Sequence, residues 1–516
     1  MLVRRVALLA LILVAYGAVL DAPRALGADA KPAQVGGFAF TDGISAAGYP
    51  GVGYDQPNRP QFHFCSKKNW LNDPNGMVWD GEFYHLFFQH NPKATRWGNM
   101  TWGHAVSRDM IRWTQRDHAL LPYQVDGRRG TIYSGTAVVD HNNSLGKQVG
   151  DTKTLCAFYT FASKPKFYQA MAYSTDGGET WTYWDEGRAV VPNQGFDNRE
   201  RDPKVFWHEA SGQWVMALWV QRKPGRVRFF TSQNLTDWRF ASDLMRDWAF
   251  ECMDVVFLPV DGDPANTKCV IYDASFDYEV GAFDGKVFRS ETPALKHARS
   301  DFYAAQTFNQ GPGGRVVQIG WMRGPRKLGG EIGVPHNQQM SFPCDLTLKS
   351  TPYGLRLFCY PIPEVASLVK TTHTLAGVTL TRDANALADL PELDLVDLDV
   401  TFRPGGAAEV VFDLPRVTLR YLTKEQKLVH TGLGDKGRQR ELTCLGNLAP
   451  RDGLVTLRLL IDRLSLEAYA FGGEAFSAHY IHPRQPAEQP CLRAIGGQAE
   501  LVELTVRELG AAWPKP

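Results

Sequence analysis

Residues 70–76 combine one carboxylate with neighbours that restrict the backbone around it. The segment reads Trp-Leu-Asn-Asp-Pro-Asn-Gly, so Asp73 lies between two asparagines. Pro74 fixes its own φ and favours an extended Asp73, and Gly76 can adopt a positive φ. A rigid carboxylate among hydrogen-bonding amides suits a nucleophile. The same composition is also typical of an Asx-turn between two strands, so this segment alone leaves both interpretations open.

Two further segments carry carboxylates suited to acid–base chemistry. Asp202 lies between Arg201 and Pro203, and the neighbouring cation favours its ionised form. Glu251 follows Trp-Ala-Phe and precedes Cys-Met, and apolar neighbours favour the neutral form of a carboxyl group, which can donate a proton. One ionised Asp and one protonated Glu divide the work in glycoside hydrolysis. Taken singly, a structural ion pair and a buried, hydrogen-bonded carboxylate remain the simpler interpretations.

Together, and in this order, the three segments resemble glycoside hydrolase family 32, which comprises invertases, levanases, inulinases and related fructan-active enzymes. The family has Trp-x-Asn-Asp-Pro-Asn-Gly, Arg-Asp-Pro and Glu-Cys blocks, and all three are present here. The resemblance is dense over about residues 58–365 and looser to about 511. It includes the segments 87–89, 97–98, 102–104, 133–135, 303–306 and 319–322. The stretch 336–343 resembles bacterial levanases and exo-inulinases more than plant or yeast invertases.

The resemblance implies a role for each matched residue. Asp73 matches the nucleophile that attacks the anomeric carbon of a β-fructofuranosyl unit, and Glu251 matches the general acid/base. Asp202 matches the carboxylate that contacts fructose hydroxyls and stabilises the transition state. The fructose pocket is implied to be lined by Asn72, Gln89, Trp97, Ser134, Arg201, Tyr303 and Trp321. Because the family retains anomeric configuration, the carboxyl groups of Asp73 and Glu251 are expected about 5–5.5 Å apart.

The chemistry of fructoside cleavage agrees with these residue types. Its transition state has oxocarbenium character, which nearby carboxylates stabilise, and an aromatic ring such as Trp97 can pack on the apolar face of fructose. The reaction needs no metal or organic cofactor, and the histidines show no ligand spacing, so we expect neither. Met253 and Cys65 stand where many family members have proline. We interpret Cys252 as a small buried residue that adjusts Glu251.

Composition and the N-terminus indicate a secreted protein of two domains. The chain has 516 residues, more than one core usually serves, and a net charge of +1 that predicts neither a nucleic-acid nor a membrane partner. Residues 1–30 read as a secretory signal peptide, with an uncleaved anchor as the alternative, and 31–57 as a flexible lead-in. Eight cysteines are too few for a disulfide scaffold in a chain of this length. We therefore expect an extracellular or periplasmic location.

An internal repeat predicts the architecture of residues 58–365. Ser-x-Asp or Ser-x-Asn follows a β-rich run three times, at Ser107, Ser174 and Ser232, and a tryptophan comes shortly after each. The spacing of roughly 60 residues fits a four-stranded blade of a β-propeller, and about 300 residues give roughly five blades. The family resemblance implies the same number, with the site at one end of the central channel. Turns and blade packing explain the repeated residues without chemistry.

After about residue 365 the pattern changes to short apolar runs separated by turn residues, which predicts a β-sandwich over 366–516. The runs are 407–412, 418–421, 454–461, 465–470 and 501–506. Glu467 lies on one of these predicted strands, where a solvent-facing or interface carboxylate is a better interpretation than a catalytic one. The sequence predicts an all-β protein, a five-bladed propeller followed by a β-sandwich.

Three functions remain open at this stage. The first is a secreted retaining β-fructofuranosidase that hydrolyses terminal fructosyl units of levan, inulin or sucrose-type substrates. The second is a fructosyltransferase that uses the same intermediate, and the third is a non-catalytic fructan-binding protein, which the presence of Asp73 and Glu251 disfavours. Linkage preference, exo or endo attack and oligomeric state depend on features outside these motifs. Loops at the pocket mouth, such as 123–130 and 324–336, are expected to set the first two.

Overall fold

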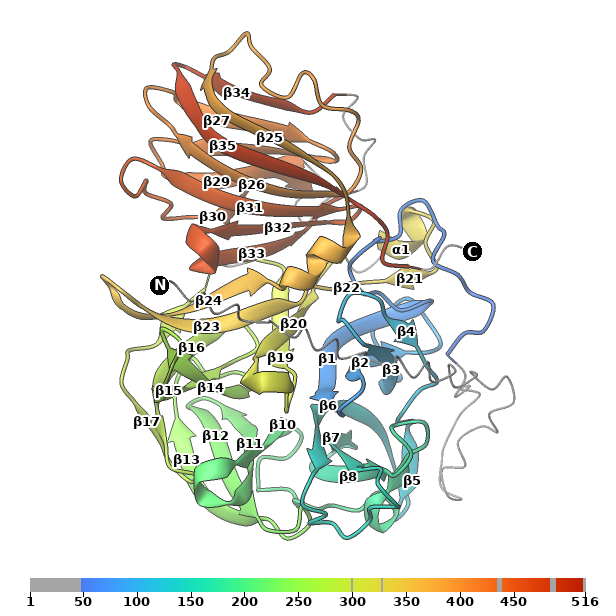
Figure 1. Cartoon of the computed structure of the whole chain (residues 1–516). Helices are drawn as coiled ribbons and strands as arrows, with labels where there is room; N and C mark the ends of the chain where they lie inside the picture. The colour runs from blue at the N-terminus through green and yellow to red at the C-terminus, as the bar shows by residue number, and fades with distance from the viewer. Residues whose placement is uncertain (1–47, 298–299, 326–327, 434–438, 483–488, 514–516) are drawn as a thin grey trace, which may run out of the picture.

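The computed structural model describes residues 48–297, 300–325, 328–433, 439–482 and 489–513. The predicted signal peptide at 1–30 and most of the predicted lead-in lie outside this part of the chain. The described end of the lead-in, 48–57, packs on the folded protein, where Tyr54 stacks on Trp513 with ring centroids 3.9 Å apart. No helix in the described ranges is long and apolar enough to cross a membrane. Figure 1 shows a ring of sheets below and a stack of strands above it.

The first three sheets of the ring are built from consecutive antiparallel strands, apart from one parallel strand in the first sheet. Sheet one contains β1 (Asn69–Trp79), β2 (Tyr84–Asn91), β3 (Thr101–Ser107), β4 (Thr114–Gln115) and, parallel to β1, β21 (His336–Asn337). Sheet two contains β5 (Tyr123–Val125), β6 (Arg128–Asp140), β7 (Thr154–Ala162), β8 (Tyr168–Ser174) and β9 (Thr182–Tyr183). Sheet three contains β10 (Arg201–His208), β11 (Gln213–Arg222), β12 (Gly225–Ser232) and β13 (Arg239–Met245).

The remainder of the ring is a ten-stranded sheet with two halves. The halves are joined where Val260 pairs with Leu348 in parallel orientation. One side contains β14 (Asp254–Val260), β15 (Asp263–Tyr272), β16 (Asp277–Phe283), β17 (Phe288–Ser290) and β18 (Leu295–Lys296). The other contains β19 (Phe302–Thr307), β20 (Val317–Met322), β22 (Gln339–Met340), β23 (Cys344–Thr351) and β24 (Gly354–Pro361). Divided at this contact, the ring has five groups of strands, which is compatible with the predicted five blades.

The repeated Ser-x-Asp/Asn and Trp residues form the same turn in three sheets. Each serine ends the third long strand, β3, β8 or β12, and its hydroxyl donates to the Asp or Asn two residues later at 2.7–3.2 Å. Each tryptophan indole donates to the carbonyl three residues before it at 2.9–3.2 Å. The residues are Ser107, Asp109 and Trp113; Ser174, Asp176 and Trp181; and Ser232, Asn234 and Trp238. The structural interpretation of the repeat is confirmed.

The C-terminal part is a β-sandwich of two sheets, as predicted. The six-stranded sheet contains β25 (Val369–Leu380), β35 (Ala499–Leu509), β26 (Val396–Arg403), β31 (Val455–Asp462), β32 (Ser465–Ala470) and β33 (Ala475–Tyr480). The five-stranded sheet contains β30 (Gln439–Leu445), β29 (Lys427–Leu433), β28 (Val417–Leu422), β27 (Glu409–Leu414) and β34 (Cys491–Ile495). Alternating apolar side chains, such as Val417, Leu419 and Tyr421 of β28, fill the space between the sheets.

Short helical turns connect some of the strands. They are η1 (Trp184–Gly187), η2 (Glu209–Ser211), η3 (Pro312–Gly314), α1 (Leu328–Glu331), η4 (Pro363–Leu368) and η5 (Phe471–Gly473). The η4 turn lies between the last strand of the ring and the first strand of the sandwich, close to the predicted domain boundary. The all-β class predicted from the sequence is confirmed.

Charged groups are buried where the sandwich meets the ring. His63 lies between Asp462, whose Oδ2 is 3.0 Å from Nδ1, and Glu467, whose Oε1 is 3.7 Å from Nε2, and all three side chains are fully buried. Glu467 also accepts from the backbone N–H of Phe342 at 2.9 Å and from the hydroxyl of Tyr469 at 2.6 Å. Glu467 is therefore an interface carboxylate, which is one of the two placements that its strand pattern predicts.

Candidate active site

The segment 70–76 is part of strand β1 and does not form a turn between strands. Trp70 and Leu71 pair with β2, the register shifts before Pro74, and pairing then continues. This bulge leaves Asp73 at a break in the ladder, where a side chain can be aimed into a site. Gly76 has a φ of +53°, and a Cβ there would lie 2.7 Å from the ring of Phe87. The Asx-turn alternative is wrong because the flanking residues keep their strand pairing.

Several functional side chains lie on, or just before, the strands nearest the centre of the ring. Contacts between β1 and β6, β6 and β10, β1 and β19, and β14 and β19 place these strands around one axis. Asp202 and Tyr303 are the second residues of β10 and β19, and Glu251 lies three residues before β14. Ser134 lies in the middle of β6. Residues far apart in the chain thereby reach the same end of the central channel.

One pocket of about 400 Å³ collects all of the site residues predicted from the sequence. They are Asp73, Asp202, Glu251, Asn72, Gln89, Trp97, Ser134, Arg201, Tyr303 and Trp321. This volume is in the range that small-molecule sites occupy. Sequence reasoning missed four further lining residues, Tyr133, Lys164, Phe167 and Asn198. Tyr133 adjoins Ser134 in a segment that already matched the family, whereas the others lie in connections between strands that carry no motif.

The segments at the mouth of the pocket are not the ones expected from the sequence. Residues 123–130 form the β5–β6 hairpin, and no residue of this range lines the pocket. The described residues of 324–336 do not line it either. The connection between β7 and β8 contributes Lys164 and Phe167 instead, and the connection before β10 contributes Asn198. Loop position relative to a pocket depends on strand order around the ring, which local sequence does not reveal.

Asp73 is held by hydrogen bonds and surrounded by other acids. Its Oδ2 accepts from the hydroxyl of Ser134 at 2.6 Å and lies 3.8 Å from the thiol sulfur of Cys252. Burial raises the pKa of Asp73, and the nearby charge of Glu251 acts in the same direction, whereas the hydrogen bond from Ser134 opposes it. A carboxylate fixed through one oxygen can present the other to a ligand in the pocket.

Asp202 is almost completely buried, with an exposed fraction of 4%. Burial raises its pKa to about 7, the charges of Glu251 and Asp73 add to this, and Arg201 opposes it. Its Oδ2 accepts from the backbone N–H of Cys252 at 3.2 Å. The sequence expectation that Arg201 keeps Asp202 ionised is therefore only partly met, because desolvation outweighs the neighbouring cation.

Glu251 is surrounded by donors rather than by apolar groups. Its Oε1 accepts from the hydroxyl of Tyr303 at 2.7 Å, and its Oε2 accepts from Arg201 Nη2 at 2.5 Å. The aromatic and sulfur-containing neighbours in sequence point elsewhere, since Phe250 packs on Trp219 and Met253 joins the core. The expected apolar setting is thus replaced by a polar one, in which both carboxylate oxygens are held in place.

The thiol of Cys252 lies within hydrogen-bonding distance of the two aspartates. Its sulfur lies 3.5 Å from Asp202 Oδ2 and 3.8 Å from Asp73 Oδ2. Burial raises the pKa of this thiol well above its usual value, so it remains protonated and can donate weakly to both carboxylates. The backbone here is strained, since Asp202, Glu251 and Cys252 have φ values of +64°, +38° and +45°. Such conformations in non-glycine residues are concentrated at functional sites.

The aromatic residues form two walls of the pocket. Trp97 is 55% exposed and packs edge-on against Tyr133, with ring centroids 6.1 Å apart. On the other wall, Trp321 lies 6.2 Å from Tyr303 and donates its indole N–H to Gln338 at 3.1 Å. Two deeper amides are already engaged: Asn72 accepts from the indole of Trp70 at 2.8 Å, and Gln89 donates to the carbonyl of Ile132 at 3.0 Å.

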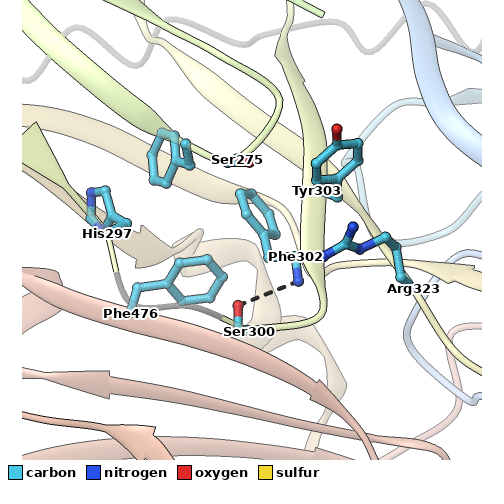
Figure 2. Close-up of a pocket in the computed structure, with 8 residues that line it drawn as sticks. Ser275, His297, Ser300, Phe302, Tyr303, Arg323 and Phe476 are labelled. Atoms are coloured by element: carbon cyan, nitrogen blue, oxygen red, sulfur yellow. Dashed lines mark hydrogen bonds between the residues drawn. The ribbon is translucent and has the colours of Figure 1, made fainter. Parts of the chain in front are cut away.

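The sandwich supports the wall that carries Tyr303. Tyr303 also lines a smaller cavity, whose volume is about 30 Å³. Figure 2 shows the side chains around it. Phe476 of β33 packs on Phe302 there, with ring centroids 5.0 Å apart, and Arg323 lies over the ring of Tyr303 at 4.3 Å. Changes in sandwich packing can therefore reach Glu251 through its hydrogen-bond partner.

The arrangement can perform acid–base and nucleophilic chemistry on a small polar ligand. Three carboxyl groups share one pocket. Asp73 accepts a hydrogen bond from a hydroxyl, Asp202 is buried, and Glu251 lies between a phenol and a guanidinium. Within the described ranges, no group of three or more His, Cys, Asp or Glu side chains is arranged to hold a metal ion, and all eight cysteines are free thiols. The carboxyl groups of the pocket can act as a nucleophile and as an acid or base.

Family models match both parts of the chain. Residues 63–361 match the model described as "Glycosyl hydrolases family 32 N-terminal domain". Residues 364–508 match the model described as "Glycosyl hydrolases family 32 C terminal".

Among curated relatives, a levanase of Bacillus subtilis (strain 168) is 33% identical over 500 residues, which cover 89% of this chain and 72% of the relative. An extracellular exo-inulinase of Aspergillus ficuum is 30% identical over 518 residues, which cover 89% of this chain and 96% of the relative. The crystal structure of an exo-inulinase from Aspergillus awamori superposes with a TM-score of 0.77 at 28% identity and covers 89% of this chain and 100% of that one. A β-fructofuranosidase of Schwanniomyces occidentalis complexed with fructosyl-erythritol also has a TM-score of 0.77, at 25% identity, over 89% of this chain and 99% of that one.

Proposed function

The chain belongs to glycoside hydrolase family 32 and acts on O-glycosyl bonds, and we propose that it is a secreted retaining β-fructofuranosidase. Its substrates are the terminal fructosyl units of levan, inulin or sucrose-type sugars. One observation carries the proposal: Asp73, Asp202 and Glu251 share a pocket. The side chains that the family is expected to use for fructose binding line the same pocket. The levanase and exo-inulinase names of the relatives support a fructan as the substrate class.

In the proposed first step, Asp73 attacks the anomeric carbon of the fructosyl unit while Glu251 gives its proton to the leaving oxygen. The bond from the anomeric carbon to that oxygen breaks, and a covalent fructosyl-enzyme forms. In the second step, Glu251 accepts a proton from water, which attacks the same carbon and releases Asp73. Asp202 binds fructose hydroxyls and stabilises the positive charge of both transition states. The hydrogen bond from Ser134 holds Asp73 in position for the attack.

Location and domain limits belong to the same proposal. The charged and apolar start of the chain supports export, and the extracellular exo-inulinase among the relatives supports it further. We place the signal peptide at 1–30, the lead-in at 31–57, the catalytic propeller at 58–365 and the sandwich at 366–516. The position of η4 between the last ring strand and the first sandwich strand supports the last division.

Product analysis tests the proposal. Purified protein is incubated separately with levan, inulin and sucrose, and early products are separated by chromatography. Fructose as the sole early product from a polymer is the expected result, and the relative rates identify the preferred linkage. Oligomers would indicate endo attack or transfer, and no product from any of the three would contradict the proposed substrates in favour of a binding role or an unusual fructoside. Asp73→Ala is expected to fold normally and to release no product, and its matched control is Asp284→Ala, which removes an exposed carboxylate from the β16–β17 turn.

A further inference from the structure

A buried ion pair lies two to three residues beyond the carboxylates of the site. Lys204 follows Asp202 by two positions on β10, and Asp254 follows Glu251 by three and begins β14. The ammonium nitrogen of Lys204 lies 2.8 Å from Asp254 Oδ1, and the side chains are 2% and 0% exposed. Neither residue lines the pocket. Any influence of the pair on the site is therefore transmitted through the backbone and not through contact with a ligand.

A third strand joins the pair. Asp254 Oδ2 accepts from the backbone N–H of Thr307 at 2.6 Å and from its hydroxyl at 3.0 Å. Lys204 donates to the same hydroxyl at 3.2 Å and to the carbonyl of Thr307 at 3.4 Å. Thr307 ends β19, the strand whose second residue is Tyr303, the donor to Glu251. One cluster of side chains thus links the strands that carry Asp202, Tyr303 and the segment of Glu251.

These strands have no backbone ladder between them; near the site, single backbone bonds run from the N–H of Ala274 to the carbonyl of Glu251 at 3.1 Å and from the N–H of Ala304 to the carbonyl of Ala274 at 2.7 Å. In the described ranges, β10 belongs to one sheet, while β14 and β19 belong to another and do not pair with each other. Apolar packing between sheets is non-directional and does not by itself fix strand positions along the channel. Hydrogen bonds and ion pairs are directional, and a fully satisfied buried network specifies one arrangement.

The energetics of burial favour a positioning role over a stabilising one. Removing two charges from water is unfavourable, and apolar residues of similar volume often replace a buried pair without loss of stability. The segments that the cluster anchors are strained, with positive φ at Asp202, Glu251 and Cys252. Strain of this kind persists only where the surrounding structure determines the backbone strongly.

We propose that the cluster of Lys204, Asp254 and Thr307 is a positioning device that sets the separation of Asp202, Glu251 and Tyr303 across the ring. Its effect on rate rests on the proposed fructosidase function, whereas its effect on geometry does not. Loss of the cluster lets the β10, β14 and β19 segments shift relative to one another. A shift of about 1 Å is sufficient to lower a catalytic rate by about 10²-fold.

The test compares Lys204→Met, Asp254→Asn and the double variant with a control pair in the sandwich. The control is Asp397→Asn, which removes a 1% exposed carboxylate that lies 2.8 Å from Arg458. We expect kcat to fall about 10- to 100-fold in both single variants and in the double variant, with little change in KM. The double variant regains thermal stability, because no unpaired charge remains buried, but it does not regain kcat. Asp397→Asn loses stability and keeps its kcat per folded molecule.

Two outcomes would overturn the proposal. The first is a double variant that recovers kcat together with stability, which would make the pair a structural element only. The second is a crystal structure of Lys204→Met in which the bonds from Tyr303 and Arg201 to Glu251 are unchanged. If the wild-type protein releases no fructose, that result contradicts the proposed function but not the positioning role of the cluster. The crystal structure of Lys204→Met then still tests the positioning role.

Discussion

Arg201 donates two hydrogen bonds to one oxygen of Glu251, from Nε at 3.1 Å and from Nη2 at 2.5 Å. The same Nε lies 3.6 Å from Asp202 Oδ2, the carboxylate next to it in sequence. The guanidinium also lies over the ring of Trp219 at 4.5 Å, and this stacking restricts the orientation of the guanidinium plane. Arg201 therefore orients the proposed acid/base first and influences Asp202 mainly through its charge.

Replacement of Arg201 by lysine tests this relationship. Lysine keeps the positive charge but lacks the planar group that can donate from two nitrogens and stack on Trp219. We expect kcat to fall by about 10²-fold, the size of effect that one misplaced acid/base group produces, with a smaller change in KM. Arg199→Lys is the matched control, since Arg199 is exposed and outside the pocket. A wild-type kcat in Arg201→Lys would contradict the orienting role.

The pH dependence of stability tests the state of Asp202. Its folded pKa is raised from 3.8 to about 7, chiefly by burial, so the folded protein holds this proton more tightly than the unfolded chain does. Its contribution to the free energy of unfolding is therefore complete below about pH 3.8 and is lost as the pH rises through about 7. Asparagine cannot ionise. We expect chemical denaturation to show the wild type losing stability relative to Asp202→Asn between these pH values, and parallel curves would contradict the assignment.

Trp97 offers a test of ligand packing at the pocket mouth. Its ring is 55% exposed, and its proposed role in the pocket predicts that a sugar ring packs on it. Stacking on an aromatic ring contributes about 0.5–1.5 kcal/mol, so Trp97→Ala is expected to raise KM for the fructoside about 2- to 12-fold. Phe240→Ala is the matched control, because Phe240 is 58% exposed and lies outside the pocket. An unchanged KM in Trp97→Ala would remove this residue from the binding site.

The buried charges between ring and sandwich predict a loss of stability in alkaline solution. The carboxylates of Asp462 and Glu467 outweigh burial and raise the pKa of His63 to about 9. A raised histidine pKa stabilises the folded state fully below about pH 6.5, and the contribution is lost as the pH rises through about 9. We expect Asp462→Asn, which leaves a buried cation with one partner fewer, to lower the free energy of unfolding by about 3–5 kcal/mol.

Denaturant titrations between pH 6 and pH 10 check this prediction. The wild type should lose stability as the pH rises, and His63→Gln should show a flatter dependence. Because the sandwich also packs behind Tyr303, activity of the folded fraction serves as a second reading. Equal pH dependence in wild type and His63→Gln would show that the histidine is neutral in the folded protein.

Much of the fold follows from local signals. The Ser-x-Asp and Trp repeat predicts the turns after β3 and β8, because short hydroxyl and carboxyl side chains close such turns wherever they occur. Asp-Gly pairs such as Asp126-Gly127 and Asp261-Gly262 lie at hairpin turns, as their preference for positive φ predicts. Each apolar run after residue 365 overlaps a sandwich strand, since each strand must bury one face.

Residues of the site could be predicted from the sequence only where they lie in a recognisable motif. The segments of Asp73, Asp202 and Glu251 each leave a structural interpretation open when taken alone, and only their joint resemblance to one family points to the site. Lys164, Phe167 and Asn198 could not be found, because their place at the pocket follows from the order of strands around the ring. The contact of Lys204 with Asp254 is also invisible in the sequence, since the two residues are far apart in the chain and no pattern reveals which buried charges pair.

The measurement that tests the central claim most directly is mass spectrometry of a trapped intermediate. Glu251→Gln is mixed with an activated aryl β-fructofuranoside, whose leaving group departs without a proton, and the reaction is quenched with acid. Since the variant lacks the base that activates water, the covalent fructosyl-enzyme accumulates. We predict a mass increase of one fructosyl unit, located on the peptide that contains Asp73. Release of the aryl group with no adduct, or with an adduct on another residue, would contradict the assignment of Asp73 as the nucleophile.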